Sequence, residues 1–93
     1  MDEQFIEGLK NYLQRLASKY DCDFRGSNEN SINYIQLLEK DAEVVITVTN
    51  NPKLAEKLKE EICDFIIKAG AKVDPPVHKP IGILESYYIK WYN

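Results

Sequence analysis

Residues 43–70 read EVVITVTNNPKLAEKLKEEICDFIIKAG, and this stretch decides the fold. Side chains of residues 43–49 alternate with the two-residue period of a β-strand. Asn51 is a favoured N-cap, and Pro52 suits the first helical position, where its missing N–H costs nothing. Apolar residues then recur at three- and four-residue steps until Gly70, which suits the left-handed position after a helix. The stretch predicts a strand that leads through one turn into an amphipathic helix.

A second amphipathic helix is predicted for residues 3–20, before this unit. Asp2 can cap its N-terminus, and one face carries Phe5, Leu9, Tyr12, Leu13, Leu16 and Tyr20. Gly8 falls in the middle of this helix, where glycine costs about 1 kcal/mol relative to alanine. We interpret Gly8 as a point of close contact with a neighbouring element.

Two strands are predicted between the helices, ahead of the central one. Residues 22–25 alternate over a short length, and residues 26–30 have the composition of a turn. Residues 31–39 form a clearer strand, joined to the central strand by a four-residue loop at 40–43. This pairing puts Ile35, Leu37, Val44, Ile46 and Val48 on the face that we assign to the helices.

The opposite face of these strands is unusually apolar. It carries Ile32, Tyr34, Gln36, Leu38, Val45, Thr47 and Thr49. A monomer rarely exposes an apolar patch of this kind to water. We expect the C-terminal segment or a second subunit to cover part of it.

The C-terminal fifth of the chain has two parts. Residues 74–80 contain three prolines and are predicted to be an extended connector. Residues 81–93 alternate and are rich in aromatic and β-branched side chains, which favours a strand, although a four-residue step also fits a helix.

Together these elements predict one α+β domain over residues 1–93, in the order α-β-β-β-α-β. We expect two layers, with an antiparallel sheet of three to four strands and two amphipathic helices on one of its faces. The first strand and the last strand rest on the weakest patterns.

Charge and composition restrict the function. The net charge of −3 argues against a general nucleic-acid-binding protein, which usually has a basic surplus. No apolar run approaches the roughly 20 residues that span a bilayer, and the acidic N-terminus lacks the layout of a signal peptide. We therefore predict a cytoplasmic protein without a membrane segment, in which Cys22 and Cys63 are free thiols.

Catalytic and metal-binding motifs are absent from the sequence. His78 is the only histidine, and its spacing from the two cysteines matches no paired zinc-ligand pattern. No Gly-x-Ser-x-Gly turn or glycine-rich phosphate loop occurs. We predict a protein that is not an enzyme and needs no cofactor or metal.

Aromatic side chains crowd the C-terminal segment, and three interpretations of them stay open. The rings can complete the core, form a hot spot for a protein partner, or stack on single-stranded nucleic acid with Arg25, Lys79 and Lys90 nearby. We predict a small non-enzymatic protein-interaction module that acts as a homodimer or an adaptor, with a nucleic-acid-binding module as the alternative. The candidate partner-binding residues are Tyr34, Tyr87, Tyr88, Lys90, Trp91 and Tyr92.

Overall fold

Two helices and six strands make up the fold, in a computed structural model that describes residues 2–24 and 33–93. In chain order the elements are α1 (Glu3–Lys19), β1 (Asp23–Phe24), β2 (Tyr34–Leu38), the short 3-10 helix η1 (Glu39–Asp41), β3 (Glu43–Thr49), α2 (Pro52–Lys68), β4 (Lys72–Val73), β5 (Val77–Ile81) and β6 (Leu84–Tyr92). The predicted α+β class and the order α-β-β-β-α-β are confirmed. The predictions for Arg25, the turn at 26–30 and Ile32 fall outside the described residues.

Both helices begin where their capping residues predict. The Asp2 side chain accepts a hydrogen bond from the Gln4 backbone N–H at 2.9 Å, and Asn51 accepts one from Leu54 at 3.2 Å. Gly70 follows α2 with a φ of +99°, the left-handed conformation that glycine adopts at little cost. No helix among the described residues has the length and apolar character needed to cross a membrane.

The sheet is larger and more mixed than the sequence predicts. Its order is β1-β2-β3-β6-β4, and β5 pairs with β6 as well. All pairs are antiparallel except β1 with β2, which run parallel. The prediction of an antiparallel sheet of three to four strands was therefore wrong in strand number and in the direction of β1. A two-residue alternation indicates a strand but does not reveal the direction in which it pairs.

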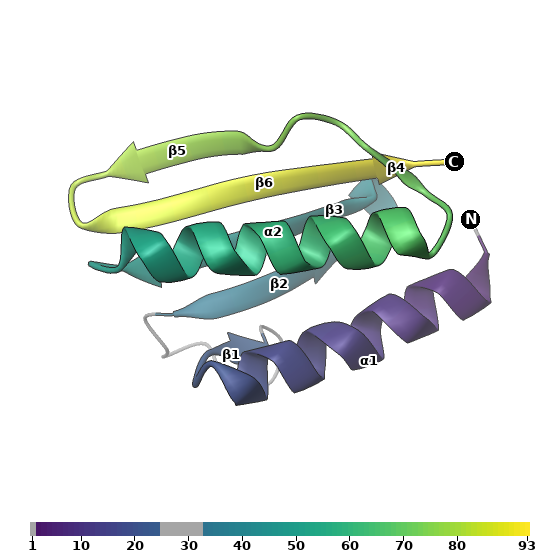
Figure 1. Cartoon of the computed structure of the whole chain (residues 1–93), viewed down its shortest axis with the longest axis horizontal. Helices are drawn as coiled ribbons and strands as arrows, with labels where there is room; N and C mark the ends of the chain where they lie inside the picture. The colour runs from purple at the N-terminus through teal and green to yellow at the C-terminus, as the bar shows by residue number, and fades with distance from the viewer. Residues whose placement is uncertain (1, 25–32) are drawn as a thin grey trace.

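The predicted connector at 74–80 is in part a strand. Residues 77–81 pair with β6, and β4 pairs with the other end of the same strand. Val73 lies opposite Trp91 and Val77 lies opposite Tyr88, so three residues of this edge face two of β6, as in a bulge. Prolines are tolerated here because an edge strand does not need every N–H for pairing. Figure 1 shows β4 and β5 along the edge of β6 that does not pair with β3.

The core lies between the sheet and the two helices, which cover the same face of the sheet (Figure 1). Ile35 pairs with Ile46 and Leu37 with Val44, which confirms the predicted facing of β2 and β3. The loop between these strands is Glu39–Ala42, one residue earlier than predicted. The largest fully buried side chains are Trp91, Leu9, Leu13, Ile35, Ile46, Leu58, Ile62, Ile66, Ile89, Val44 and Val48.

Candidate functional site

The face of the sheet turned away from α1 and α2 is here called the outer face. Strand register assigns its side chains, because residues paired across strands point to the same side. On β2, β3, β4, β5 and β6 they are Tyr34, Gln36, Leu38, Glu43, Val45, Thr47, Thr49, Lys72, Val77, Lys79, Ile81, Leu84, Ser86, Tyr88, Lys90 and Tyr92. No described helix lies on this face, and the C-terminal strand widens it instead of covering it. Of the two covers expected for this face, the C-terminal segment is therefore not one, and a second subunit stays a prediction.

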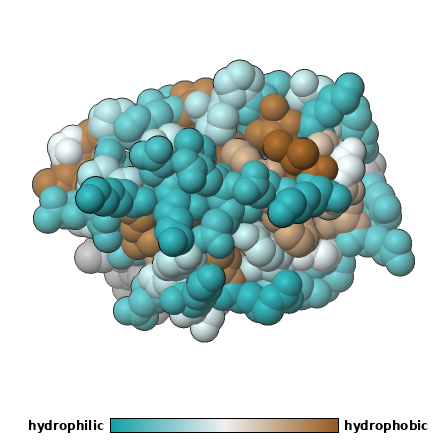
Figure 2. Space-filling model, in the orientation of Figure 1, coloured by the Kyte–Doolittle hydropathy of each residue, from teal (hydrophilic) through white to brown (hydrophobic). Residues whose placement is uncertain are grey.

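Apolar side chains are exposed on the outer face near the turn that joins β5 to β6. Ile81 is 70% exposed and pairs directly with Leu84, which is 39% exposed. Val77, further along β5, is also exposed, and so is Ile83 in the turn itself. The turn is held in place because the Asn50 backbone N–H donates to the Ile83 carbonyl at 2.6 Å. Figure 2 shows apolar surface at the end of the molecule where Figure 1 places this turn.

Tyrosines and lysines occupy the rest of the β4–β5–β6 half of the outer face. The Lys79 ammonium lies 4.9 Å from the centre of the Tyr88 ring, within the range of a cation–π contact. Lys72 pairs with Tyr92 across β4 and β6, while Lys90 lies opposite Glu43 of β3. The outer positions of β4, β5 and β6 carry three lysines and no carboxylate.

The middle of the outer face is made of small side chains. Val45 and Thr47 of β3 are buried although no described helix covers them, and in the register Val45 lies between Gln36 and Tyr88. The Thr47 and Ser86 hydroxyls are 3.1 Å apart and hydrogen-bonded. The outer face therefore has a closely packed centre and exposed side chains along β5 and β6.

The six predicted partner-binding residues are divided between the two faces of the sheet. Tyr34, Tyr88, Lys90 and Tyr92 lie on the outer face. Trp91 is 1% exposed, and its ring centre lies 5.8 Å from that of Phe5 in α1. Its ring offers no surface to a partner, because the register of β6 turns it toward the helices.

Tyr87 also lies on the helix side of the sheet, in a small cluster with His78 and Glu85. Its ring stacks on His78 with centres 4.5 Å apart, and His78 Nε2 lies 3.2 Å from Glu85 Oε2. Burial raises the pKa of Tyr87, and the carboxylates of Glu56, Glu85 and Glu60 raise it further. Across residues 2–24 and 33–93, no group of three or more His, Cys, Asp or Glu side chains is arranged to hold a metal ion.

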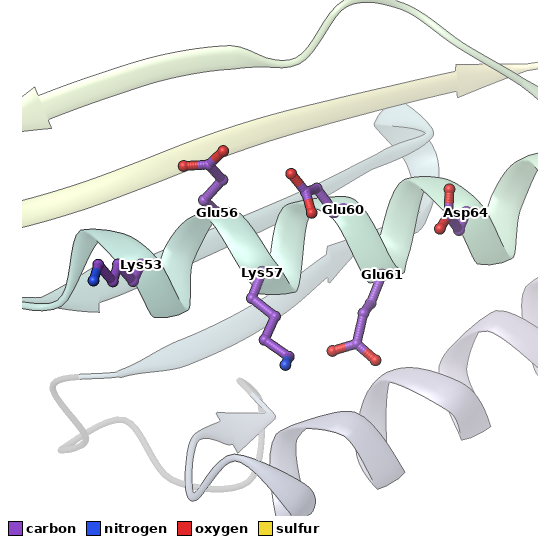
Figure 3. Close-up of a pocket in the computed structure, with 6 residues that line it drawn as sticks. All are labelled: Lys53, Glu56, Lys57, Glu60, Glu61 and Asp64. Atoms are coloured by element: carbon purple, nitrogen blue, oxygen red, sulfur yellow. The ribbon is translucent and has the colours of Figure 1, made fainter.

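A shallow hollow of about 580 Å³ runs along the exposed side of α2. Its lining comes from that helix alone: Lys53, Glu56, Lys57, Glu60, Glu61 and Asp64. Figure 3 shows Glu56 and Glu60 pointing toward β6, while Lys57 and Glu61 point toward α1. Glu61 accepts a hydrogen bond from the Tyr20 hydroxyl at 2.7 Å, so it joins the two helices. The mixed charges of these six side chains, all from one helix, fit a solvated helix surface.

The thiols of Cys22 and Cys63 are free. Burial raises the pKa of both, which keeps them in the protonated form at neutral pH. A reactive cysteine requires the opposite shift, toward the thiolate.

Several outer-face residues had not been singled out as binding residues from the sequence, among them Val77, Ile81 and Leu84. The signal that could have found them is the Ile81-Gly82-Ile83-Leu84 turn, which is short enough to join two paired strands. This turn signal was not recognised because Pro80 directly precedes the turn, and proline usually argues against a strand.

Comparison with known proteins gave no match to a family model, to a curated protein or to a solved structure.

Proposed function

We propose that this protein is a non-enzymatic protein-interaction module that binds another protein chain through its outer face. One observation carries the proposal: the outer face has no described helix over it, yet it carries apolar side chains that are 39% to 70% exposed near the β5–β6 turn. Surfaces that combine exposed aliphatic residues with tyrosines are typical of protein-binding sites.

Packing supports a rigid binding surface. The exposed side chains come from β5 and β6, and β6 is paired along most of its length with the central strand β3. A preformed surface loses little conformational entropy on binding, which favours affinity. The free thiols also fit the cytoplasmic location that the sequence predicts.

A nucleic-acid-binding module is the second candidate, and one contact favours it. Lys79 lies over the Tyr88 ring on an open sheet face, which is the pairing of cation and aromatic ring that single-stranded nucleic acid uses. The net charge of −3 opposes this function.

Site-directed photocrosslinking in the native host tests the proposal. A photoreactive side chain replaces Lys79 on the outer face or, as a control, the 55%-exposed Ile67 on α2. We expect position 79 to crosslink one protein reproducibly and position 67 to crosslink none. That protein is then purified, and its affinity is measured against the wild type, Leu84→Ser and Ile67→Ser.

Leu84→Ser should weaken binding at least tenfold, the effect expected for a contact worth about 1.4 kcal/mol, while Ile67→Ser leaves it unchanged. Equal crosslinking at both positions, or equal affinity of both variants, would contradict the proposal. Crosslinks from position 79 to nucleic acid would favour the second candidate instead. Crosslinks between two copies, with a dimer mass in sedimentation, would identify the homodimer form of the module.

A further inference from the structure

Charge is distributed unevenly over the molecule, and the charge of the outer face differs from the net charge of the whole protein. The protein carries a net charge of −3, but the outer positions of β4, β5 and β6 carry only positive charges, from Lys72, Lys79 and Lys90. Glu43 on β3 lies opposite Lys90 and offsets part of that charge. Lys72 and Lys79 lie opposite Tyr92 and Ser86, so neither faces a carboxylate across the strand pair.

The most exposed pair of apolar side chains lies at one end of β6 and the lysines lie further along it, with the exposed Val77 opposite Tyr88 between Lys79 and Lys72. Ile81 and Leu84 are at the turn end, and the outer positions of β5 and β6 at this end carry no charge. Lys79 lies further along and leans over Tyr88, and Lys72 lies at the far end beside Tyr92. From Leu84 to Tyr92 the strand spans about 26 Å, at roughly 3.3 Å per residue.

We infer that the partner presents an acidic polypeptide segment whose apolar side chains cover the turn end and whose carboxylates reach Lys79 and Lys72. This inference rests on the proposed function and names the chemistry of its partner. Burial of Ile81 and Leu84 provides most of the affinity, because apolar burial is the main favourable contribution at protein interfaces. The lysines provide orientation and a faster association rate, because charged groups at the edge of an interface mainly steer the encounter.

A second copy of this chain fits the surface less well. Two copies that meet through their outer faces would bring two sets of three lysines together, and the copies repel each other through their overall charge. Single-stranded nucleic acid also fits less well. It carries a phosphate at every nucleotide and would meet no cation at the turn end, where the side chains are aliphatic.

Peptide selection tests the inference while the natural partner is still unidentified. A random peptide library displayed on phage is selected on the intact wild-type protein, and the enriched peptides are then measured for binding to the double variant Ile81→Ser/Leu84→Ser. We expect the enriched peptides to combine Asp or Glu with Leu, Ile or Phe, and the two kinds of residue to lie in separate parts of each peptide. The peptides should bind the wild type more weakly as salt concentration rises.

Charge-reversal variants measure how much the lysines contribute to peptide affinity, and a matched pair of substitutions on α2 is the control. Lys72→Glu/Lys79→Glu should weaken binding of an enriched peptide by roughly tenfold at low salt. Lys53→Glu/Lys57→Glu makes the same change of charge on α2 and should alter the affinity less than about twofold. Circular dichroism of both variants verifies that each is folded.

The outcomes separate the inference from the proposed function. Enriched peptides that are neutral or basic, yet lose binding to Ile81→Ser/Leu84→Ser, overturn the acidic partner and support the outer face as a protein-binding surface. Peptides that bind this variant as well as the wild type, or the absence of any enrichment, contradict both. A twelve-nucleotide oligo(dT) that binds the wild type with a steep salt dependence, in the absence of acidic peptides, overturns the inference in favour of nucleic acid.

Discussion

The two faces of the sheet are built from the same strands but contribute differently to the protein. Along β6, Ile89 and Trp91 are buried beneath the helices, whereas Leu84 and Tyr92 on the other side are 39% and 46% exposed. Burial of large apolar side chains contributes about 1.5–3 kcal/mol each, so the helix side supplies most of the stability. The outer face contributes less to folding, which leaves its exposed side chains available for the binding that we propose.

The largest expected effect concerns two neighbouring aromatic residues on opposite faces. Trp91→Ala should lower the free energy of unfolding by about 3–5 kcal/mol, because it leaves a cavity beside Phe5. Tyr92→Ala should lower it by less than about 1 kcal/mol. Urea denaturation of both variants measures the difference, and similar losses would refute the division between the two faces.

A smaller effect of opposite sign, an increase in the free energy of unfolding, is expected for a substitution in α1, one of the two helices that cover the sheet. The sequence interpretation of Gly8 as a point of close contact was wrong, because a Cβ added there meets no atom within 4 Å. Gly8→Ala should therefore raise the free energy of unfolding by about 0.5–1 kcal/mol through helix propensity. It should leave binding at the outer face unchanged. Thermal and urea denaturation check the stability, and a destabilised variant would show an unrecognised contact.

The contact between the two helices should appear as a dependence of stability on pH. The hydrogen bond to Glu61 raises the pKa of Tyr20 above its ordinary value, with smaller contributions from burial and charge. The folded state then keeps this proton to higher pH than the unfolded chain, whose tyrosine pKa is about 10. The stabilisation is complete below about pH 10 and is lost as pH rises through the folded pKa.

Tyr20→Phe removes this contribution. Its stability should fall less steeply than that of the wild type as pH rises above about 10, as measured by urea denaturation at each pH. Tyr12 and Tyr87, whose pKa values burial also raises, remain in both proteins and provide the background slope. Identical slopes would show that the Tyr20–Glu61 hydrogen bond does not contribute to the pH dependence of stability.

The smallest expected effect on stability is at the turn end of the outer face. Ile81→Ser should change the free energy of unfolding by less than about 0.5 kcal/mol, because 70% of this residue is already exposed. The same substitution should weaken partner binding. A loss of stability above about 2 kcal/mol would place Ile81 in the structural core and weaken its assignment to binding.

Local signals explain how much of the fold could be predicted from the sequence. Asp2, Asn51 and Gly70 mark helix ends by interactions within a few residues, and the helical period then follows directly. The facing of β2 against β3 was also predictable, because a loop at 40–43 and a loop at 39–42 both place Ile35 beside a residue of the buried set. These features depend on neighbours in the chain, which a sequence displays.

The remaining features depend on contacts between distant segments. Alternation in residues 81–93 indicated two sets of side chains, but only the pairing of β6 with β3 decides that Trp91 faces inward and Tyr88 outward. The strand at 77–81 was not predicted because proline usually argues against a strand, although an edge strand accommodates Pro80. The exposed surface of Ile81 and Val77 was missed for the same reason.

Lysine footprinting of the protein bound to its partner shows directly whether the outer face is the binding surface. An amine-reactive reagent modifies accessible lysines, and mass spectrometry compares each site in the free and the bound protein. We predict that Lys72 and Lys79 become protected on binding, while Lys53 and Lys57 on α2 react at the same rate as before. Protection of the α2 lysines with unchanged reaction at Lys72 and Lys79 would contradict the outer face as the binding surface.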